Sequence, residues 1–402
     1  GARTPEKAAD DVGVRSKHSM EAACARKSDV FTTVSQITAT EAELLLGRAA
    51  QPLLPNGIDV GVVDELAGPV DRAAARAKLL DIAYRMTGEK LDDAALLLLS
   101  GRYEFHNKGI DMLLDALAQV NATAGKPIVL FLTVPAGQSG VGQELRRRLE
   151  AMPAGVNVAL GVSTHNLIDP DADPIQQAAR RLGFDNRAGA RVRVIQIPIY
   201  LHKSDGLLNL PYEAVLRAVD LSVFPSFYEP WGYTPQESLA VGVPTVSTDL
   251  AGFGLWAQAE KLGPEDGVWV LPRFGVADAL ATAELARGIE RFIAEEIERP
   301  GMRVVCRRTA LRTAWSDLVQ RYYQAFESAL ELARIYAGRW EHELYFREIK
   351  HQLRRTALLQ SHTVETGAQE IAAIVLASAV IATERAHAAT AEISALRVSF
   401  GQ

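Results

Sequence analysis

The hydrophobic positions of the chain fall in short runs that alternate with amphipathic stretches between residues 94 and 271. Such short apolar runs are typical of buried strands. We expect strands at 96–100, 128–134, 192–199, 221–224, 243–247 and 268–271. Helices should lie between them, at 110–121, 143–150, 175–182, 211–219 and 234–242. Strand and helix in alternation predict an α/β fold, with a parallel sheet covered by helices on both faces.

Helical patterns also flank this central region. They cover 14–29, 38–48, 70–87, 277–298, 303–315 and 316–359, and an alanine-rich helical pattern covers 366–398. A short strand at 30–34 precedes Ser35, which should cap the helix that follows it. We place a domain junction at the turn Pro55-Asn56-Gly57 and predict three regions: 1–57, 58–325 and 326–402.

Composition and charge narrow the classes of function. The chain has 402 residues and a net charge of −6, so it has room for two or three domains and no surface suited to nucleic acid. The longest apolar run, 371–381, is too short for a bilayer, which takes about 20 residues. Only two cysteines are present, which favours a reducing compartment, so we expect a cytoplasmic protein with no membrane partner. The polar opening after Gly1 suggests that a preceding region is missing.

The stretch 222–254 concentrates the candidate chemistry. Its first strand enters a loop rich in Pro, Gly and aromatic residues, and Thr234-Pro235-Gln236-Glu237 then has the pattern of a capping box between Thr234 and Glu237. A helix N-terminus that opens from a Gly-containing loop after a strand can seat a phosphate group. We therefore predict a nucleotide-sugar site in this stretch.

Two cations lie on another loop between a strand and a helix. Arg102 and Lys108 fall within 101–109, where two positive side chains and backbone amides would suit a diphosphate. The alternative is a solvated surface loop in which Glu104 is the internal partner of these cations.

Glu229 and Glu237 lie eight positions apart in the stretch 222–254. They could form an acid/base pair of the kind that glycoside hydrolases use. Alternatively, Glu237 only completes the capping box and Glu229 is a loop carboxylate, although its place between Tyr228 and Pro230 is unusual for a solvated charge. Tyr212, at the start of the preceding helix, is either a core aromatic or a base-stacking one.

Two further patterns carry less information. The run 252–257 matches GxGxxA, but no acid follows at the distance that a dinucleotide site requires, so we expect a loop of close backbone approach. A basic helix face at 303–312 is either solvated or a site for an anion; it comprises Arg303, Arg307, Arg308 and Arg312.

Taken together, five separated motifs closely resemble the animal and fungal type of glycogen synthase (glycosyltransferase family 3). The longest is 226–237 (Ser-Phe-Tyr-Glu-Pro-Trp-Gly-Tyr-Thr-Pro-Gln-Glu), continued by 242–244 and 251–254. The other four occur in the same order as in the family, at 30–38, 55–57, 101–109 and 164–166. The resemblance covers about residues 20–325.

The resemblance implies a GT-B fold, in which two Rossmann-like domains face each other across a cleft. It implies transfer of glucose from UDP-glucose to the non-reducing end of an α-1,4-glucan, with retention and without a metal or other cofactor. Retention in such enzymes is attributed to front-face attack assisted by the leaving phosphate. By resemblance, Arg102 and Lys108 hold the diphosphate and Glu229 supports the oxocarbenium-like transition state.

The resemblance also assigns the remaining donor contacts. Tyr212 would stack on uracil and Glu237 would bind the ribose. Backbone amides around Gly232, Tyr233 and Thr234 would contact the phosphates, and we include the adjacent Trp231 among the donor-binding residues.

Three departures from the family's pattern stand out. Residues 1–57 resemble only the last part of the N-terminal domain, so the chain should be largely the donor-binding half. Ala22 stands where the family has an active-site Arg. The region between Val134 and Thr164 is much shorter than in enzymes where it helps form a tetramer, so homo-oligomerisation stays open.

Two other functions remain possible. The chain could belong to a GT-B transferase with another sugar nucleotide or acceptor. It could also be a non-catalytic nucleotide-sugar-binding protein, which Ala22 and the missing half would favour.

Overall fold

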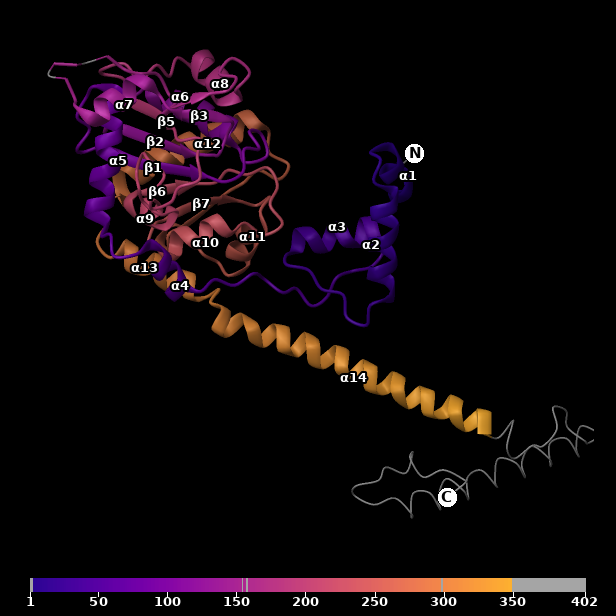
Figure 1. Ribbon diagram of the computed structural model, residues 1–402. Helices are drawn as coiled ribbons and strands as arrows, with labels where there is room; N and C mark the ends of the chain where they lie inside the picture. Colours follow the sequence, from indigo (N-terminus) through magenta and orange to yellow (C-terminus); the bar gives the residue numbers. More distant parts are fainter. Residues whose placement is uncertain (1–2, 154, 157, 298, 349–402) are drawn as a thin grey trace, which may run out of the picture. The chain divides into compact units, whose positions relative to one another are not determined.

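The computed structural model describes residues 3–153, 155–156, 158–297 and 299–348 (Figure 1). The chain divides into two compact units, Gly1–Tyr323 and Gln324–Gln402. The further division that we expect at residue 57 stays a prediction.

A six-stranded parallel sheet forms the centre of the first unit (Figure 1). Its strands are β1 (Ala95–Ser100), β2 (Ile128–Thr133), β5 (Val192–Gln196), β6 (Leu221–Val223), β7 (Thr245–Thr248) and β8 (Val268–Leu271). Their spatial order is β5-β2-β1-β6-β7-β8, which is the doubly wound order of dinucleotide-binding folds. The predicted α/β fold with a parallel, Rossmann-like sheet is therefore confirmed.

Helices cover both faces of this sheet because its strands are apolar on both sides. Leu96 and Leu98 of β1 enter one core, whereas Leu97 and Leu99 enter the other. The first core is covered by α5 (Arg72–Thr87), α9 (Tyr212–Ala218), α10 (Tyr233–Ala240), α11 (Gly252–Ala259) and α13 (Met302–Leu311). The second core is covered by α6 (Ile110–Asn121), α8 (Pro174–Leu182) and α12 (Asp278–Arg291).

The first residues fold into helices α1 (Pro5–Asp11), α2 (Arg15–Lys27) and α3 (Gln36–Leu46). Ser35 caps α3 as predicted, because its Oγ accepts a hydrogen bond from the Thr38 backbone N–H at 3.4 Å. The strand expected at 30–34 is reduced to isolated bridges from Phe31 to Gln51 and from Thr33 to Leu53.

Several elements differ from the sequence expectation. Helices α1 and α4 (Val60–Ala67) and the antiparallel pair β3 (Gln138–Val141) and β4 (His165–Leu167) were not predicted. The expected loop at 252–257 is wrong, because these residues form the start of α11. Close backbone approach there is nevertheless confirmed: a Cβ on Gly252 would clash with the Pro230 carbonyl oxygen, and one on Gly254 with that of Thr248.

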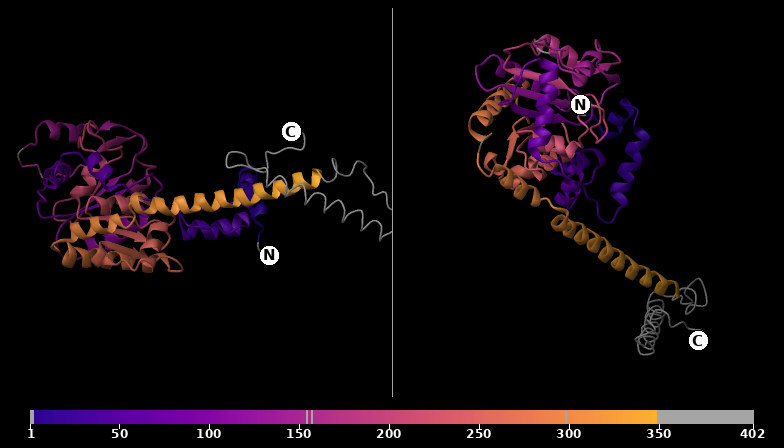
Figure 2. Two further views of the ribbon diagram at one scale, coloured as in Figure 1. Left: turned by 90° about the horizontal axis from the view of Figure 1, so that it is seen from below. Right: turned by 60° about the vertical axis from the view of Figure 1, so that its left-hand side comes forward.

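The remaining elements are α7 (Gln143–Glu150), which matches its prediction, a 3₁₀ turn at Pro264–Asp266, a π-helical turn at Phe292–Glu296, and α14 (Trp315–Glu348). Helix α14 continues unbroken to the end of the described region (Figure 2). Its predicted extension to 359 and the alanine-rich pattern at 366–398 lie outside the described residues. Within the described part of the chain, every helix is too short or too polar to cross a bilayer.

Candidate functional site

The two loops that carry the predicted chemistry follow neighbouring strands. Loop 101–109 leaves the carboxyl end of β1, and loop 224–232 leaves the carboxyl end of β6, which pairs with β1 in parallel. The strand order reverses between β1 and β6, since β2 lies on the other side of β1. Ligands of open α/β sheets bind in the crevice at such a switch point.

A direct ion pair joins the two loops. The Lys108 ammonium donates a hydrogen bond to Glu229 Oε1, and the two side chains are only 14% and 16% exposed. The Ser226 hydroxyl also donates to Glu229 Oε1, at 3.4 Å. The backbone N–H of Phe227 donates to the Asn107 carbonyl at 2.7 Å. The fold therefore brings a cation and a carboxylate together that are distant in the sequence.

Arg102 lies on the same loop as Lys108 in a different environment. Its side chain is 75% exposed, and its Nη1 pairs with Glu104 Oε1 at 2.7 Å. Glu104 also accepts a hydrogen bond from the side-chain amide of Asn107, at 2.7 Å. Glu104 is thus the partner of Arg102 within this loop, as the solvated-loop alternative expected. Lys108 pairs instead with Glu229 of the other loop.

Helix α10 begins at Tyr233, directly after Gly232, whose φ of 95° is a conformation that favours glycine. The predicted capping box is wrong: Thr234 lies inside the first turn, and α10 has no side-chain hydrogen bond at its N-cap. The first N–H groups of a helix have no partner within the helix, and the helix dipole favours negative charge there. The segment 232–234 therefore keeps the properties of an anion seat.

Trp231 supports this loop from the interior. Its indole is buried, and its Nε1 donates to Gln236 Oε1 at 2.7 Å. Gln236 in turn donates to the Asn56 carbonyl at 2.9 Å. The ring lies 6.1 Å from that of Phe253, in an edge-to-face arrangement. A ligand at the switch point could therefore meet only the backbone of Trp231.

Tyr212 and Glu237 form a second group of interacting side chains. The Tyr212 hydroxyl lies 2.9 Å from Ser100 Oγ and also interacts with the Glu237 carboxyl. Burial raises the pKa of Glu237, and the nearby Glu213 carboxylate adds to this rise. Burial and the Glu237 charge likewise raise the pKa of Tyr212. Glu229 and Glu237 thus have separate partners, which does not suit the acid/base pair considered above.

Contacts that sequence reasoning missed connect residues 1–57 to this site. The Tyr228 hydroxyl donates to Glu41 Oε2 of α3 at 2.8 Å. The pKa of Tyr228 is raised mainly by burial and, to a smaller extent, by this hydrogen bond to the Glu41 carboxylate. A Cβ on Gly252 would also lie 2.6 Å from Ser35 Cβ. Ala22, at the position where an Arg was expected, is buried in α2. No local pattern indicates that Tyr228 and Glu41 should meet, because they are far apart in the chain.

The basic face at 303–312 is largely committed to internal contacts. Arg303 donates to the backbone carbonyls of Arg217 and Val219, at 3.2 and 2.9 Å. Arg307 pairs with Asp64 at 2.7 Å, and Arg312 pairs with Glu260. These contacts favour a structural function for the face.

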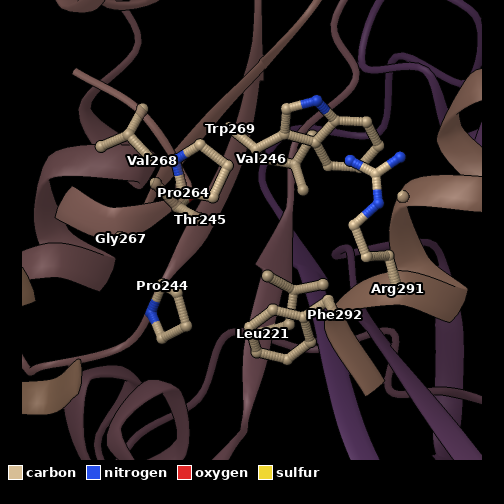
Figure 3. A pocket seen from close by; sticks show the side chains of 11 residues that line it. Leu221, Pro244, Thr245, Val246, Pro264, Gly267, Val268, Trp269, Arg291 and Phe292 are labelled. Carbon is tan, nitrogen blue, oxygen red and sulfur yellow. The ribbon is translucent and has the colours of Figure 1, made fainter. Parts of the chain in front are cut away.

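An apolar cavity of about 70 Å³ lies at the amino ends of the strands, opposite to the carboxyl ends that carry the two loops (Figure 3). Leu221, Thr245 and Val268, which are the first residues of β6, β7 and β8, line it together with Trp269 and Phe292. This cavity is at the amino ends of the strands, so it is separate from the switch point. Among the described residues, no cluster of three or more His, Cys, Asp or Glu side chains has the arrangement of a metal site.

Comparison with known proteins gives a family and two groups of relatives. The family model described as "Glycogen synthase" matches residues 5–148 and 138–380. The liver glycogen (starch) synthase of Homo sapiens is 30% identical over 404 residues, covering 84% of this chain and 56% of that protein. Glycogen (starch) synthase isoform 1 of Saccharomyces cerevisiae is 30% identical over 355 residues, covering 70% of this chain and 50% of that protein. The chain therefore spans about half the length of these curated relatives.

Solved structures are more distantly similar. A sucrose-phosphate synthase from Thermosynechococcus elongatus matches with a TM-score of 0.45 and 20% identity, covering 81% of this chain and 62% of that one. HepE from Anabaena, solved in complex with UDP and glucose, matches with a TM-score of 0.48 and 17% identity, covering 78% of this chain and 67% of that one.

Proposed function

Because the chain belongs to the glycogen synthase family, we propose that it is the donor-binding part of a retaining glucosyltransferase. This enzyme would move glucose from UDP-glucose to the non-reducing end of an α-1,4-glucan. The observation that carries the proposal is the contact between Lys108 and Glu229, which sets a cation and a carboxylate side by side at the switch point of a doubly wound sheet.

The leaving diphosphate would be held from both loops. Lys108 and Arg102 would donate charge-assisted hydrogen bonds to it, and the amides of Gly232, Tyr233 and Thr234 would contact it from the start of α10. Negative charge grows on the diphosphate as the bond to glucose breaks, so fixed positive groups stabilise the transition state more than the bound donor. Since these groups supply the positive charge, we expect no metal or other cofactor.

The reaction would occur beside Glu229. An acceptor hydroxyl attacks C1 of the glucose on the face from which the diphosphate departs, the C1–O bond breaks, and the hydroxyl proton passes to an oxygen of the leaving phosphate. Positive charge develops on C1 and the ring oxygen during this step, and the Glu229 carboxylate would stabilise it electrostatically. Lys108 would position this carboxylate through the ion pair.

The nucleoside would lie at the second group. Tyr212 would stack on the uracil and Glu237 would accept a hydrogen bond from the ribose, while Trp231 would contribute only through its backbone. A cytoplasmic location and a glucan acceptor belong to this proposal.

Calorimetric titration of UDP and uridine into the chain tests the phosphate assignment. Each of Arg102→Ala and Lys108→Ala should weaken UDP by roughly tenfold, which is about 1.4 kcal/mol, and leave uridine nearly unchanged, because uridine lacks the phosphates. Equal losses for UDP and uridine would refute the assignment. Competition between UDP-glucose and other sugar nucleotides separates this enzyme from a transferase with another donor.

A non-catalytic nucleotide-sugar-binding protein is a second candidate, and buried Ala22 is the observation that favours it. The methyl side chain of Ala22 cannot supply the positive charge that an arginine at this position would bring to the site. An assay of glycogen elongation by the complete gene product with UDP-glucose distinguishes the two functions. Product formation excludes the non-catalytic function, whereas intact UDP binding without product formation supports the non-catalytic function.

A further inference from the structure

An exposed aromatic pair joins the two loops that carry Lys108 and Glu229. The rings of His106 and Phe227 lie 5.2 Å apart, with an angle of 36° between their planes. Phe227 is 46% exposed, and the His106 side chain is 61% exposed. Aromatic side chains are enriched at binding surfaces relative to the rest of a protein's surface.

Both rings are held in place although they are exposed. The buried Arg273 guanidinium lies 5.2 Å from the centre of the Phe227 ring, and its Nη1 donates to the Pro225 carbonyl at 2.7 Å. A cation over an aromatic face is attractive, so Arg273 fixes the ring from the interior. On the other loop, His106 Nδ1 lies 2.6 Å from Asp111 Oδ2. A ligand would therefore meet two aromatic rings that are already ordered, which reduces the entropy lost on binding.

The pair lies one short step along the chain from the proposed chemistry. His106 is two positions before Lys108, and Phe227 is two positions before Glu229. Two residues of extended chain span at most roughly 7 Å. The backbone positions of the aromatic pair are thus within about one sugar ring of those of Lys108 and Glu229.

We propose that His106 and Phe227 form a saccharide-binding platform for the α-glucan acceptor, an inference that rests on the proposed function. The two faces of a glucose ring carry C–H groups, which pack on the electron-rich face of an aromatic ring. The hydroxyl groups around the sugar's edge stay in water or reach polar side chains. Aromatic rings with few convergent polar groups are typical of small-molecule sites.

The test is a pair of titrations on the whole chain, one with UDP and one with maltoheptaose. Phe227→Ala should weaken maltoheptaose by roughly three- to tenfold, the range that one aromatic contact supplies, and should leave UDP unchanged. His106→Ala should act in the same direction with a smaller loss, and Phe227→Tyr, which keeps the ring, should bind nearly as the parent chain does. Phe326→Ala is the matched control, because Phe326 is a 64% exposed aromatic outside the candidate site.

The outcomes separate the platform from the proposed function. If UDP binding is intact and the parent chain and Phe227→Ala bind maltoheptaose equally well, the platform is refuted and the proposed function is not. The same holds if the parent chain binds UDP but no maltoheptaose. A parent chain that binds neither UDP nor UDP-glucose overturns the proposed function. Unchanged UDP affinity in Phe227→Ala also shows that the variant is folded, so weaker maltoheptaose binding then supports the platform.

Discussion

The contact between Lys108 and Glu229 should couple the two switch-point loops energetically. Lys108→Met and Glu229→Gln, made separately and together, form a double-mutant cycle that isolates this pair. Exposed ion pairs couple by about 0.2–1 kcal/mol, whereas breaking a buried pair costs about 3–5 kcal/mol. Since these side chains are 14% and 16% exposed, we expect a coupling energy of about 2 kcal/mol, between these limits.

The assay is urea denaturation of the four proteins, which gives the free energy of unfolding of each. The pair Arg102 and Glu104 is a matched control on the same loop, because its side chains are 75% and 31% exposed. A second cycle, Arg102→Met with Glu104→Gln, should give about 0–0.5 kcal/mol. A coupling for Lys108 and Glu229 as small as that of the control would refute the reasoning, since burial would then add nothing to the interaction.

Three other changes give measurable effects. Gly109→Ala should lower the free energy of unfolding by at least about 2 kcal/mol, because Gly109 has a φ of 67° and a Cβ would clash with the Pro225 carbonyl; an unchanged urea midpoint would contradict this. Tyr228→Phe should cost about 1 kcal/mol through loss of the hydrogen bond to Glu41, and Tyr228→Phe made in a Glu41→Gln background should cost less. The raised pKa of Glu237 means that this group contributes stability below its unfolded-state value of 4.5 and that this contribution is lost as the pH rises through the higher folded-state value. Glu237→Gln should therefore flatten the fall in stability above pH 4.5, and parallel curves for both proteins would speak against the assignment.

The elements that hold the site could be predicted from local patterns. Helix α6 matches its predicted range, and β1 differs from its prediction by one residue, because the periodicity of buried side chains reports local structure directly. The loops at 101–109 and 224–232 were also identified, since strand, loop and helix follow one another in the expected order. That β1 and β6 are neighbours is a property of the sheet order, which no single segment encodes.

The start of α10 shows why local patterns can mislead. Thr234 and Glu237 have the spacing of a capping box, yet the helix begins one residue earlier, at Tyr233, after a glycine with positive φ. The Glu237 carboxyl interacts with the Tyr212 hydroxyl instead. The start of the helix thus depends on the backbone of Gly232 and not on a side-chain cap, which the spacing of Thr234 and Glu237 could not reveal.

The ion pair at the switch point also makes the site a reporter of folding. Lys108 and Glu229 are 121 positions apart in the sequence, so an unfolded or partly assembled chain holds them together only rarely. Any ligand that touches both loops must therefore bind the assembled sheet and not the unfolded chain. Mass action then gives about 2.7 kcal/mol of added stability at a ligand concentration 100 times the dissociation constant. A rise in melting temperature with added ligand would register both occupancy of the site and completion of the sheet that builds it.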